Sequence, residues 1–402
     1  MKTPSTTSAR LAGRIKHLTG SVARDILSRT QDKEIISFAG GLPDATLWQD
    51  LKLPEVPPAA YQYGPSEGEH SLRSILAERN NSLGLPATPE NTLITSGSQQ
   101  GIDLAAKLLL EPGTPLILEA PSYLAAIQVF SLFEAELHTL AVDTDGICPQ
   151  ALDRLLTETQ APAVYLNPTF QNPSGKCYSL ERRQQIAAVL DQHGTLLMED
   201  DPYRDIYYDE APPAPIASFL KSAPWIYFAS VSKTLIPGLR LGSLTCSPEL
   251  YDDLLKLKQA SDLHSNRPAQ FIAASMLADE AERAERIEGL CQHYRQKRDS
   301  MQQALAQHFT DLATWEIPSG GMFFWLDLEQ SIDLYAALEK TLEKGVAFMP
   351  GSPFFTEKCD QGCSIRINFS LVSPKSMDKG IKILSDAVRD LQQASTCVES
   401  IA

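Results

Sequence analysis

The chain has 402 residues, of which 43% are hydrophobic, so it is long enough to bury the cores of two domains. Its formal net charge of −15 and the lack of a long basic block disfavour non-specific binding to nucleic acid or to anionic membranes. The seven cysteines form no Cys-x-x-Cys pair and no segment is apolar for long enough to cross a bilayer, so we expect a cytoplasmic, soluble protein without a metal site.

The first segment, Met1 to Arg24, is basic, rich in Ser and Thr and free of acidic residues. Organelle transit peptides share this composition, but we expect a mature N-terminus. The part before residue 50 is too short for an independent DNA-binding domain.

From about residue 90, short apolar runs alternate with amphipathic stretches, a pattern that predicts a parallel sheet covered by helices. The predicted strands are Thr92–Ile94, Pro115–Leu118, Ala163–Leu166, Thr195–Met198, Trp225–Ala229 and Ser243–Cys246. The predicted helices are Gln100–Leu110, Leu180–Gln192 and Leu250–Ala260.

One long helical region is expected from Ala269 to about Phe309. After Pro318 the composition shifts to shorter units, which indicate a smaller α+β domain. Its expected elements are the strands Phe323–Leu326 and Ser364–Asn368 and the helices Ile332–Lys344 and Ser376–Gln393.

Polar residues follow several of the predicted strands, where ligands bind in open α/β sheets. The Ser/Gly-rich run from Thr95 to Gly101 leads into a helix and offers free N–H groups to a phosphate. The same residues are also typical of an ordinary helix N-cap without a ligand. The run from Asn167 to Gly175 holds Asn172 between two prolines as a fixed amide donor, although a structural turn also explains it.

Three acids in sequence, Glu199 to Asp201, follow the strand Thr195–Met198. Such a cluster is costly to bury unless it is paired with a cation. A protonated pyridine nitrogen would satisfy Asp200, and Tyr203 is close enough in sequence to reach the phenolic oxygen of the same ring.

The run from Ser230 to Arg240 follows the strand Trp225–Ala229 and contains Lys233 beside two hydroxyl groups. A desolvated lysine among cations becomes a nucleophile for a Schiff base, and the Arg240 guanidinium can bind a phosphate. The run therefore indicates pyridoxal phosphate, whereas taken alone it also fits a strand end followed by a basic turn.

Three further motifs, Ile36–Pro43, Tyr63–Gly68 and Ile365–Ser370, complete an ordered set that covers nearly the whole chain. With them, the sequence resembles the fold-type I pyridoxal-phosphate aminotransferases of class I/II, most closely the branch with 2-aminoadipate and kynurenine aminotransferases. The resemblance implies an N-terminal segment at 1–48, a large cofactor-binding α/β domain with a mixed, mostly parallel seven-stranded sheet at 49–290, and a small α+β domain at 291–402.

The resemblance also assigns roles to residues of the cofactor site. Lys233 would be the Schiff-base lysine, Asp200 the partner of the pyridine nitrogen, and Tyr203 and Asn172 the ligands of the ring oxygen O3′. Tyr123 would stack on the ring. The phosphate would be held by Ser98, Gln99, Ser230, Ser232 and Arg240, with Tyr63 reaching over from the second subunit of a homodimer.

On the substrate side, the resemblance implies that Arg366 grips the α-carboxylate together with Asn172, and that Gly40 permits close approach of the substrate. Arg24 matches an arginine that related enzymes use near the substrate side chain. Two departures, Val231 in place of a more usual aromatic residue and Ser243 in place of a large one, bear on pocket shape rather than on cofactor use.

The implied activity is transfer of an amino group from an L-amino acid to a 2-oxo acid, plausibly 2-oxoglutarate, by a ping-pong route in which Lys233 is the general base. A β-lyase, decarboxylase or racemase using the same cofactor is an alternative, as is a regulator that uses an aminotransferase-like domain to sense an effector. The sequence leaves the amino donor open among aromatic, branched, kynurenine-like and aminoadipate-like substrates.

Overall fold

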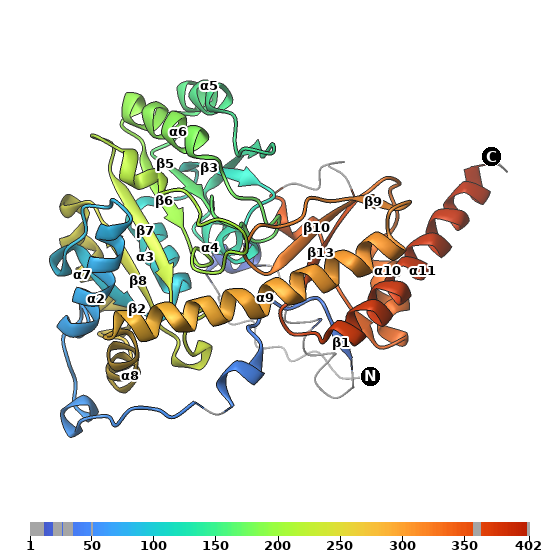
Figure 1. The fold of residues 1–402 in the computed structure, drawn as a ribbon. Coiled ribbons are helices and arrows are strands. Elements are labelled where there is room, and N and C mark those ends of the chain that lie inside the picture. Colours follow the sequence, from blue (N-terminus) through green and yellow to red (C-terminus); the bar gives the residue numbers. More distant parts are fainter. Residues whose placement is uncertain (1–11, 19–25, 27–34, 50, 357–362, 400–402) are drawn as a thin grey trace, which may run out of the picture.

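The computed structural model describes residues 12–18, 26, 35–49, 51–356 and 363–399, with side chains up to residue 393 (Figure 1). Two sheets, one of seven strands and one of four, are flanked by helices and linked by one long helix (Figure 1). In the part of the chain so described, no helix has the length and apolar character needed to cross a membrane.

The large sheet has the strand order β2-β8-β7-β6-β5-β3-β4. Only β8 runs antiparallel to its neighbours, so the predicted mixed, mostly parallel sheet is confirmed. The strands are β2 (Thr92–Thr95), β3 (Pro115–Ala120), β4 (Glu136–Ala141), β5 (Ala163–Leu166), β6 (Leu196–Asp200), β7 (Trp225–Ser230) and β8 (Gly242–Cys246). The edge strand β4 was not predicted, because its sequence mixes polar and apolar residues and it is only partly buried.

Helices cover both faces of this sheet, so its central strands are buried throughout. Alternate side chains of β5, such as Val164 and Tyr165, enter two different apolar clusters. The helices are α2 (His70–Ser82), α3 (Ser98–Leu109), α4 (Leu124–Leu132), α5 (Pro149–Thr159), α6 (Leu180–His193), α7 (Pro248–Asp262) and α8 (Arg267–Leu277). The α5 and α6 helices cover one face, and α3, α4 and α7 the other.

The long helical region expected from Ala269 to Phe309 is two helices, α8 and α9 (Glu280–His308). The break was not predicted from the apolar spacing, which continues across it. Asp279 starts α9 by accepting a hydrogen bond from the backbone N–H of Glu282 (3.0 Å), which satisfies a free donor of the first turn. The α9 helix then runs from the large sheet to the small one (Figure 1).

The small sheet is antiparallel, with the order β12-β13-β10-β9, and α10 and α11 pack beside it as predicted for a small α+β unit. Its strands are β9 (Ala313–Thr314), β10 (Phe323–Leu328), β12 (Met349–Pro350) and β13 (Cys363–Asn368), and its helices α10 (Leu334–Glu343) and α11 (Pro374–Glu399). A separate parallel pair joins β1 (Ile36–Ser37) to β11 (Val346–Ala347). Short 3₁₀ helices lie at η1 (Gly13–His17), η2 (Ala45–Trp48), η3 (Pro58–Tyr61), η4 (Pro89–Asn91), η5 (Ile216–Phe219), η6 (Pro237–Leu239) and η7 (Ser352–Phe354).

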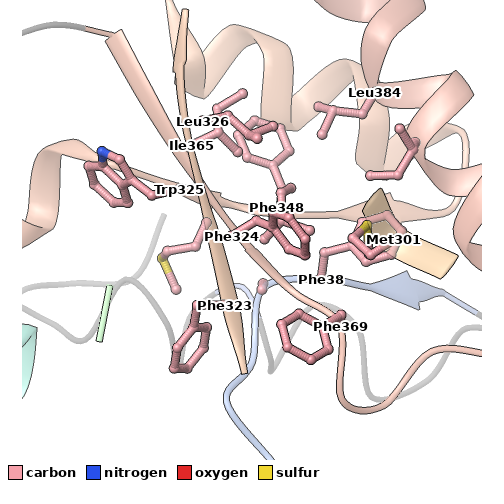
Figure 2. Packing of buried hydrophobic residues seen from close by; sticks show 14 of the residues in the cluster. Phe38, Met301, Phe323, Phe324, Trp325, Leu326, Phe348, Ile365, Phe369 and Leu384 are labelled. Atoms are coloured by element: carbon pink, nitrogen blue, oxygen red, sulfur yellow. The ribbon is translucent and has the colours of Figure 1, made fainter. Parts of the chain in front are cut away.

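One apolar cluster holds the small sheet to segments that are distant in the sequence (Figure 2). Phe38 follows β1, Met301 lies on α9 and Leu384 lies on α11, and all three are fully buried in this cluster. The segment at residues 36–39 is thereby fixed against the small sheet, which places the glycines that follow it beside the cavity described below.

A buried ion pair joins the same N-terminal segment to α9. The Asp44 carboxylate accepts a hydrogen bond from the Lys297 ammonium (2.5 Å), and Lys297 also donates to the Ser370 carbonyl (2.6 Å). Burial raises the pKa of Asp44, but hydrogen bonds from Lys297 and Thr46 outweigh it and hold that pKa at about 2. The ion pair therefore stabilises the fold over the whole neutral range.

Replacing Asp44 with alanine is expected to lower the free energy of unfolding by about 3–5 kcal/mol, because it leaves the Lys297 ammonium buried without a carboxylate. Since the folded-state pKa of Asp44 is depressed, this contribution is present above its unfolded pKa near 4 and is lost as the pH falls towards 2. Urea unfolding at pH 7 and at pH 3 measures both effects. As a control, Asp386→Ala breaks an exposed pair with Lys382 and is expected to cost less than about 1 kcal/mol; equal losses in the two variants would contradict the assignment.

Candidate active site

The loops after β2, β5, β6 and β7 meet at one end of the large sheet around a cavity of about 120 Å³. This is where an open α/β sheet binds its ligands. Every residue predicted for the cofactor lines it except Tyr63. The lining residues are Gly97, Ser98, Gln99, Tyr123, Asn167, Asn172, Asp200, Pro202, Tyr203, Ser230, Ser232, Lys233 and Arg240.

One end of the cavity is suited to an anion. Gly97, at φ +81°, leads into α3, whose first N–H groups have no partner within the helix. A Cβ at Gly97 would lie 2.9 Å from Nη2 of Arg240, so glycine is needed for the guanidinium to approach the helix start. Arg240 also lies 3.4 Å from the Ser232 hydroxyl. A phosphate fits this combination of a cation, hydroxyls and free N–H groups.

Lys233 lies between the anion end of the cavity and the small sheet. Its Nζ donates to the Gly41 carbonyl (2.8 Å) and lies 5.6 Å from the centre of the Tyr203 ring. Burial, together with the nearby Arg240 and Arg366 charges, lowers the pKa of Lys233 to about 8. At pH 7 roughly a tenth of the amine is therefore neutral, which is the form that a nucleophile or a general base requires.

The three acids that end β6 have different partners, although all are buried. Glu199 accepts from the backbone N–H groups of Ile216 (3.0 Å) and Ala217 (2.9 Å). Asp201 pairs with the Arg204 guanidinium and accepts from the Tyr227 hydroxyl (2.8 Å). Glu199 is thus satisfied within the protein, and Asp201 is paired with a cation although its Oδ1 has no hydrogen-bond partner. Of the three acids, the middle one, Asp200, lines the cavity.

Asp200 has no cationic partner among the described residues. One of its oxygens, Oδ2, accepts from the Tyr165 hydroxyl (2.8 Å), and the other, Oδ1, is buried without a partner in hydrogen-bond geometry. Burial raises the pKa of Asp200 to about 7. A protonated ring nitrogen would supply both the missing partner and the missing positive charge, so this orphaned oxygen fits pyridoxal phosphate.

Tyr203 and Asn172, the two residues predicted to bind the ring oxygen of the cofactor, both line the cavity. A hydrogen bond joins their side chains, and Asn172 Oδ1 also accepts from Nη1 of Arg366 (2.8 Å). Burial raises the pKa of Tyr203 well above its usual range, so its hydroxyl stays protonated and can donate to an oxygen of the ring.

Arg366, on β13, is 5% exposed and reaches the cavity from the small sheet. Its Nη2 donates to the Ala39 carbonyl, and its Nε has no partner. The guanidinium lies 4.5 Å from the centre of the Phe323 ring and 5.0 Å from that of Phe354. Burial lowers the pKa of Arg366 to about 10, and a carboxylate would relieve this desolvation.

The predicted residues Tyr63 and Gly40 do not line the cavity. Tyr63 is 77% exposed and packs edge-on against the His264 ring at 5.7 Å. Arg24 lies outside the described residues. Gly40 is buried between Ala39 and Gly41, whose carbonyls contact Arg366 and Lys233 respectively.

Three residues near the reacting groups were not predicted. Phe323 and Phe354 flank Arg366, and nothing in their sequence neighbourhood distinguishes them from other core phenylalanines. Asn167 was treated only as the start of the turn that presents Asn172, yet it lines the cavity beside Asp200. Because Asn167 directly follows a buried strand, the sequence could have indicated it as a residue of the cavity.

Comparisons with known proteins agree on one family. The family model for class I and II aminotransferases matches residues 56–384. A 2-aminoadipate transaminase of Thermus thermophilus is 34% identical over 94% of this chain and 96% of its own length, and an aromatic-amino-acid aminotransferase of Thermococcus litoralis is 33% identical over 92% of each. The crystal structure of Pyrococcus horikoshii kynurenine aminotransferase with PMP matches with a TM-score of 0.87 at 30% identity, over 95% of this chain and 97% of that one.

Proposed function

Since the chain belongs to the class I and II aminotransferases, which are pyridoxal-phosphate enzymes that move an amino group from an amino acid to a 2-oxo acid, we propose that the cavity above is its active site. The observation that carries this proposal is the meeting of Lys233 and Asp200 in one cavity with Arg366, which donates to the cavity residue Asn172. Oδ1 of Asp200 and Nε of Arg366 each lack a partner that the cofactor or the substrate would supply.

In this proposal the cofactor supplies an aldehyde that bonds to amines and a ring that accepts an electron pair. Lys233 would be the amine that bonds the aldehyde carbon, and its Nζ, once free, would carry the proton lost by the substrate α-carbon. Asp200 holds the ring nitrogen, while Tyr203 and Asn172 donate to the ring oxygen and Tyr123 covers one ring face. The phosphate is held by Ser98, Gln99, Ser230, Ser232 and Arg240.

We assign the substrate α-carboxylate to Arg366 and Asn172, with Gly40 and Gly41 providing backbone that a substrate can approach closely. The free Nε of Arg366 and its two flanking aromatic rings support this assignment. Arg24 remains our candidate for contact with the substrate side chain.

Replacing Arg366 with lysine is expected to lower kcat/KM for amino acid donors by about tenfold to a hundredfold, because an ammonium replaces two parallel charged hydrogen bonds with one. Affinity for pyridoxal phosphate is expected to stay unchanged. Initial rates over a range of donor concentrations, with cofactor titrations, measure both. The matched control is Arg389→Lys on α11, an exposed pair with Asp311, which should behave as wild type. A loss of cofactor affinity in Arg366→Lys would contradict the assignment.

We propose that two copies of the chain share their active sites, with Tyr63 of one subunit reaching the phosphate of the other. The support is an exposed aromatic patch: Tyr61 is 72% exposed and Tyr63 77%, and both line a surface pocket with His264 and Arg267. Large exposed aromatic side chains gathered in one place are typical of an interface.

Mixed dimers test this sharing. Lys233→Ala and Tyr63→Ala are each expected to be nearly inactive alone, and co-expression of the two is expected to restore about a quarter of wild-type activity, because half of the dimers are hybrids with one intact site. Rates per mole of purified dimer measure this. Failure of complementation, with hybrid dimers shown to be present, would place Tyr63 in the site of its own chain and contradict the proposal.

We further propose a division into an N-terminal segment (1–48), a large domain (49–290) and a small domain (291–402). The separate apolar clusters around the two sheets support it, with α9 crossing from one to the other. A cytoplasmic location is proposed from the five cysteines whose side chains are described, all of which are free thiols.

For the substrates we propose 2-oxoglutarate as acceptor and, as donor, an amino acid of the kinds that the similar proteins' names state: 2-aminoadipate, an aromatic amino acid or kynurenine. The test adds single donors to the purified holoenzyme without acceptor and follows the visible absorbance of the cofactor. A donor that removes the band, which then returns on adding 2-oxoglutarate, supports the proposal. If the band returns only with other 2-oxo acids, 2-oxoglutarate is not the acceptor. Release of ammonia without any acceptor would indicate a lyase.

A further inference from the structure

Asn167 is the residue that directly follows β5, and it lines the cavity beside Asp200. Its side chain is 1% exposed. Burial of an amide is costly unless its polar atoms have partners, so the contacts of Asn167 indicate what it does.

The backbone of Asn167 is fixed from behind by a buried acid. Its N–H donates to Oε1 of Glu119, the fifth residue of β3, at 2.7 Å. The other oxygen of Glu119 accepts from the Tyr178 hydroxyl at 2.5 Å. Burial raises the pKa of Glu119 to about 7, against the effect of these hydrogen bonds. Glu119 thereby joins the ends of β3 and β5 and leaves Asn167 little freedom to move.

Asn167 and Asp200 lie side by side at the ends of neighbouring strands, because Leu166 of β5 is the register partner of Glu199 in β6, and both residues line the cavity. Hydrogen bonding from the Asn167 amide lowers the pKa of Asp200 and opposes the effect of burial, as the Tyr165 hydroxyl also does. The amide oxygen of Asn167 is buried without a partner, which is consistent with the NH₂ group being the one turned towards the carboxylate.

The kind of donor matters as much as its presence. The neighbouring acids Glu199 and Asp201 lie near arginines, whereas Asp200 accepts from the uncharged Tyr165 hydroxyl and lies beside the uncharged amide of Asn167. A neutral donor orients a carboxylate and favours its ionised form without cancelling its charge. The full negative charge of Asp200 thus remains available to a cation in the cavity.

We propose that Asn167 is a positioning residue that acts through Asp200: it aims the carboxylate at the ring nitrogen of the cofactor and helps to keep it ionised. The inference rests on the role proposed above for Asp200. It predicts that the benefit of Asn167 depends on the ring nitrogen and not on the rest of the cofactor.

The test compares pyridoxal phosphate with its 1-deaza analogue, in which a C–H group replaces the ring nitrogen. Affinities of the cofactor-free protein for each are measured by equilibrium dialysis, for wild type and for Asn167→Leu. We expect the substitution to weaken binding of pyridoxal phosphate by about tenfold, and binding of the analogue by less than about twofold. Asn80→Leu is the control, because it removes another buried amide, which donates to Thr245 (3.0 Å) outside the cavity.

Equal losses for the two cofactors in Asn167→Leu would show a merely structural role and overturn the proposal, as would unchanged affinities for both. If Asn167→Leu does not fold, Asn167→Ser provides the same comparison, because its hydroxyl is too short to replace the amide. A wild-type protein that binds pyridoxal phosphate but shows no preference over the analogue overturns the role of Asp200 as well. Failure of the wild type to bind pyridoxal phosphate at all would instead reject the proposed function.

Discussion

Lys233→Ala is expected to lower the steady-state rate of transamination by about a thousandfold or more, because the variant loses both the covalent tether and the general base. No second lysine lines the described cavity, so no other amine stands ready to replace it. The measurement is the rate of 2-oxo acid production from a donor that the wild type accepts, with cofactor in excess so that weaker binding does not dominate.

Lys221→Ala is a matched control, because Lys221 is exposed and lies outside the cavity. Lys233→Arg tests whether the positive charge alone is sufficient. An arginine keeps the cation but has no neutral form near pH 7, so this variant is expected to be as slow as the alanine variant. Because burial and two neighbouring arginines lower the pKa of Lys233 to about 8, capture of the cofactor by wild type should quicken with rising pH and level off above about pH 8. Turnover near wild type in Lys233→Ala would reject the assignment.

Asp200→Asn is expected to have opposite effects on activity and on the stability of the cofactor-free protein. Turnover should fall by about a hundredfold to a thousandfold, since the ring nitrogen loses a buried ionic partner. The cofactor-free variant should nevertheless unfold at a higher temperature than cofactor-free wild type at neutral pH, because the buried carboxylate with its orphaned oxygen is gone.

The effect of Asp200→Asn on the stability of the cofactor-free protein is expected to depend on pH. The folded-state pKa of Asp200 is raised to about 7, so the folded protein binds its proton more tightly than the unfolded chain does. This stabilises the protonated protein below a pH of about 4, and the advantage is lost as the pH rises towards 7. Thermal unfolding of both cofactor-free proteins should therefore show a higher unfolding temperature for Asp200→Asn than for wild type at pH 7, and little difference between them at pH 4. A gap of constant size would contradict the predicted titration.

Much of the cavity could be predicted from the sequence, because the residues concerned directly follow short, fully buried strands. Asp200 ends β6, and Lys233 follows β7 by three residues. A parallel sheet brings the residues that follow its strands together at one edge, so the local sequence pattern was sufficient to predict that Asp200 and Lys233 share a site. Arg366 differs: it lies within β13, and only the resemblance to a known family singled it out.

The remaining features depend on contacts between distant segments, which no local pattern records. The placement of Phe323 and Phe354 around Arg366 depends on how β10, η7 and β13 pack against one another. The break before α9 rests on one capping aspartate, Asp279, within a continuing apolar spacing. Tyr63, for its part, is exposed in the single chain, so its predicted role needs a second copy.

The long helix α9 has a mechanical consequence. Its 29 residues make a rod about 44 Å long that begins at the short break after α8 and packs at its far end against the unit that carries Arg366. A rotation of about 5° at this break moves the far end by about 4 Å, more than the length of a hydrogen bond. If Arg366 holds the substrate carboxylate as proposed, the direction in which α9 leaves Ala278 and Asp279 affects that contact, although both residues are far from any reacting atom.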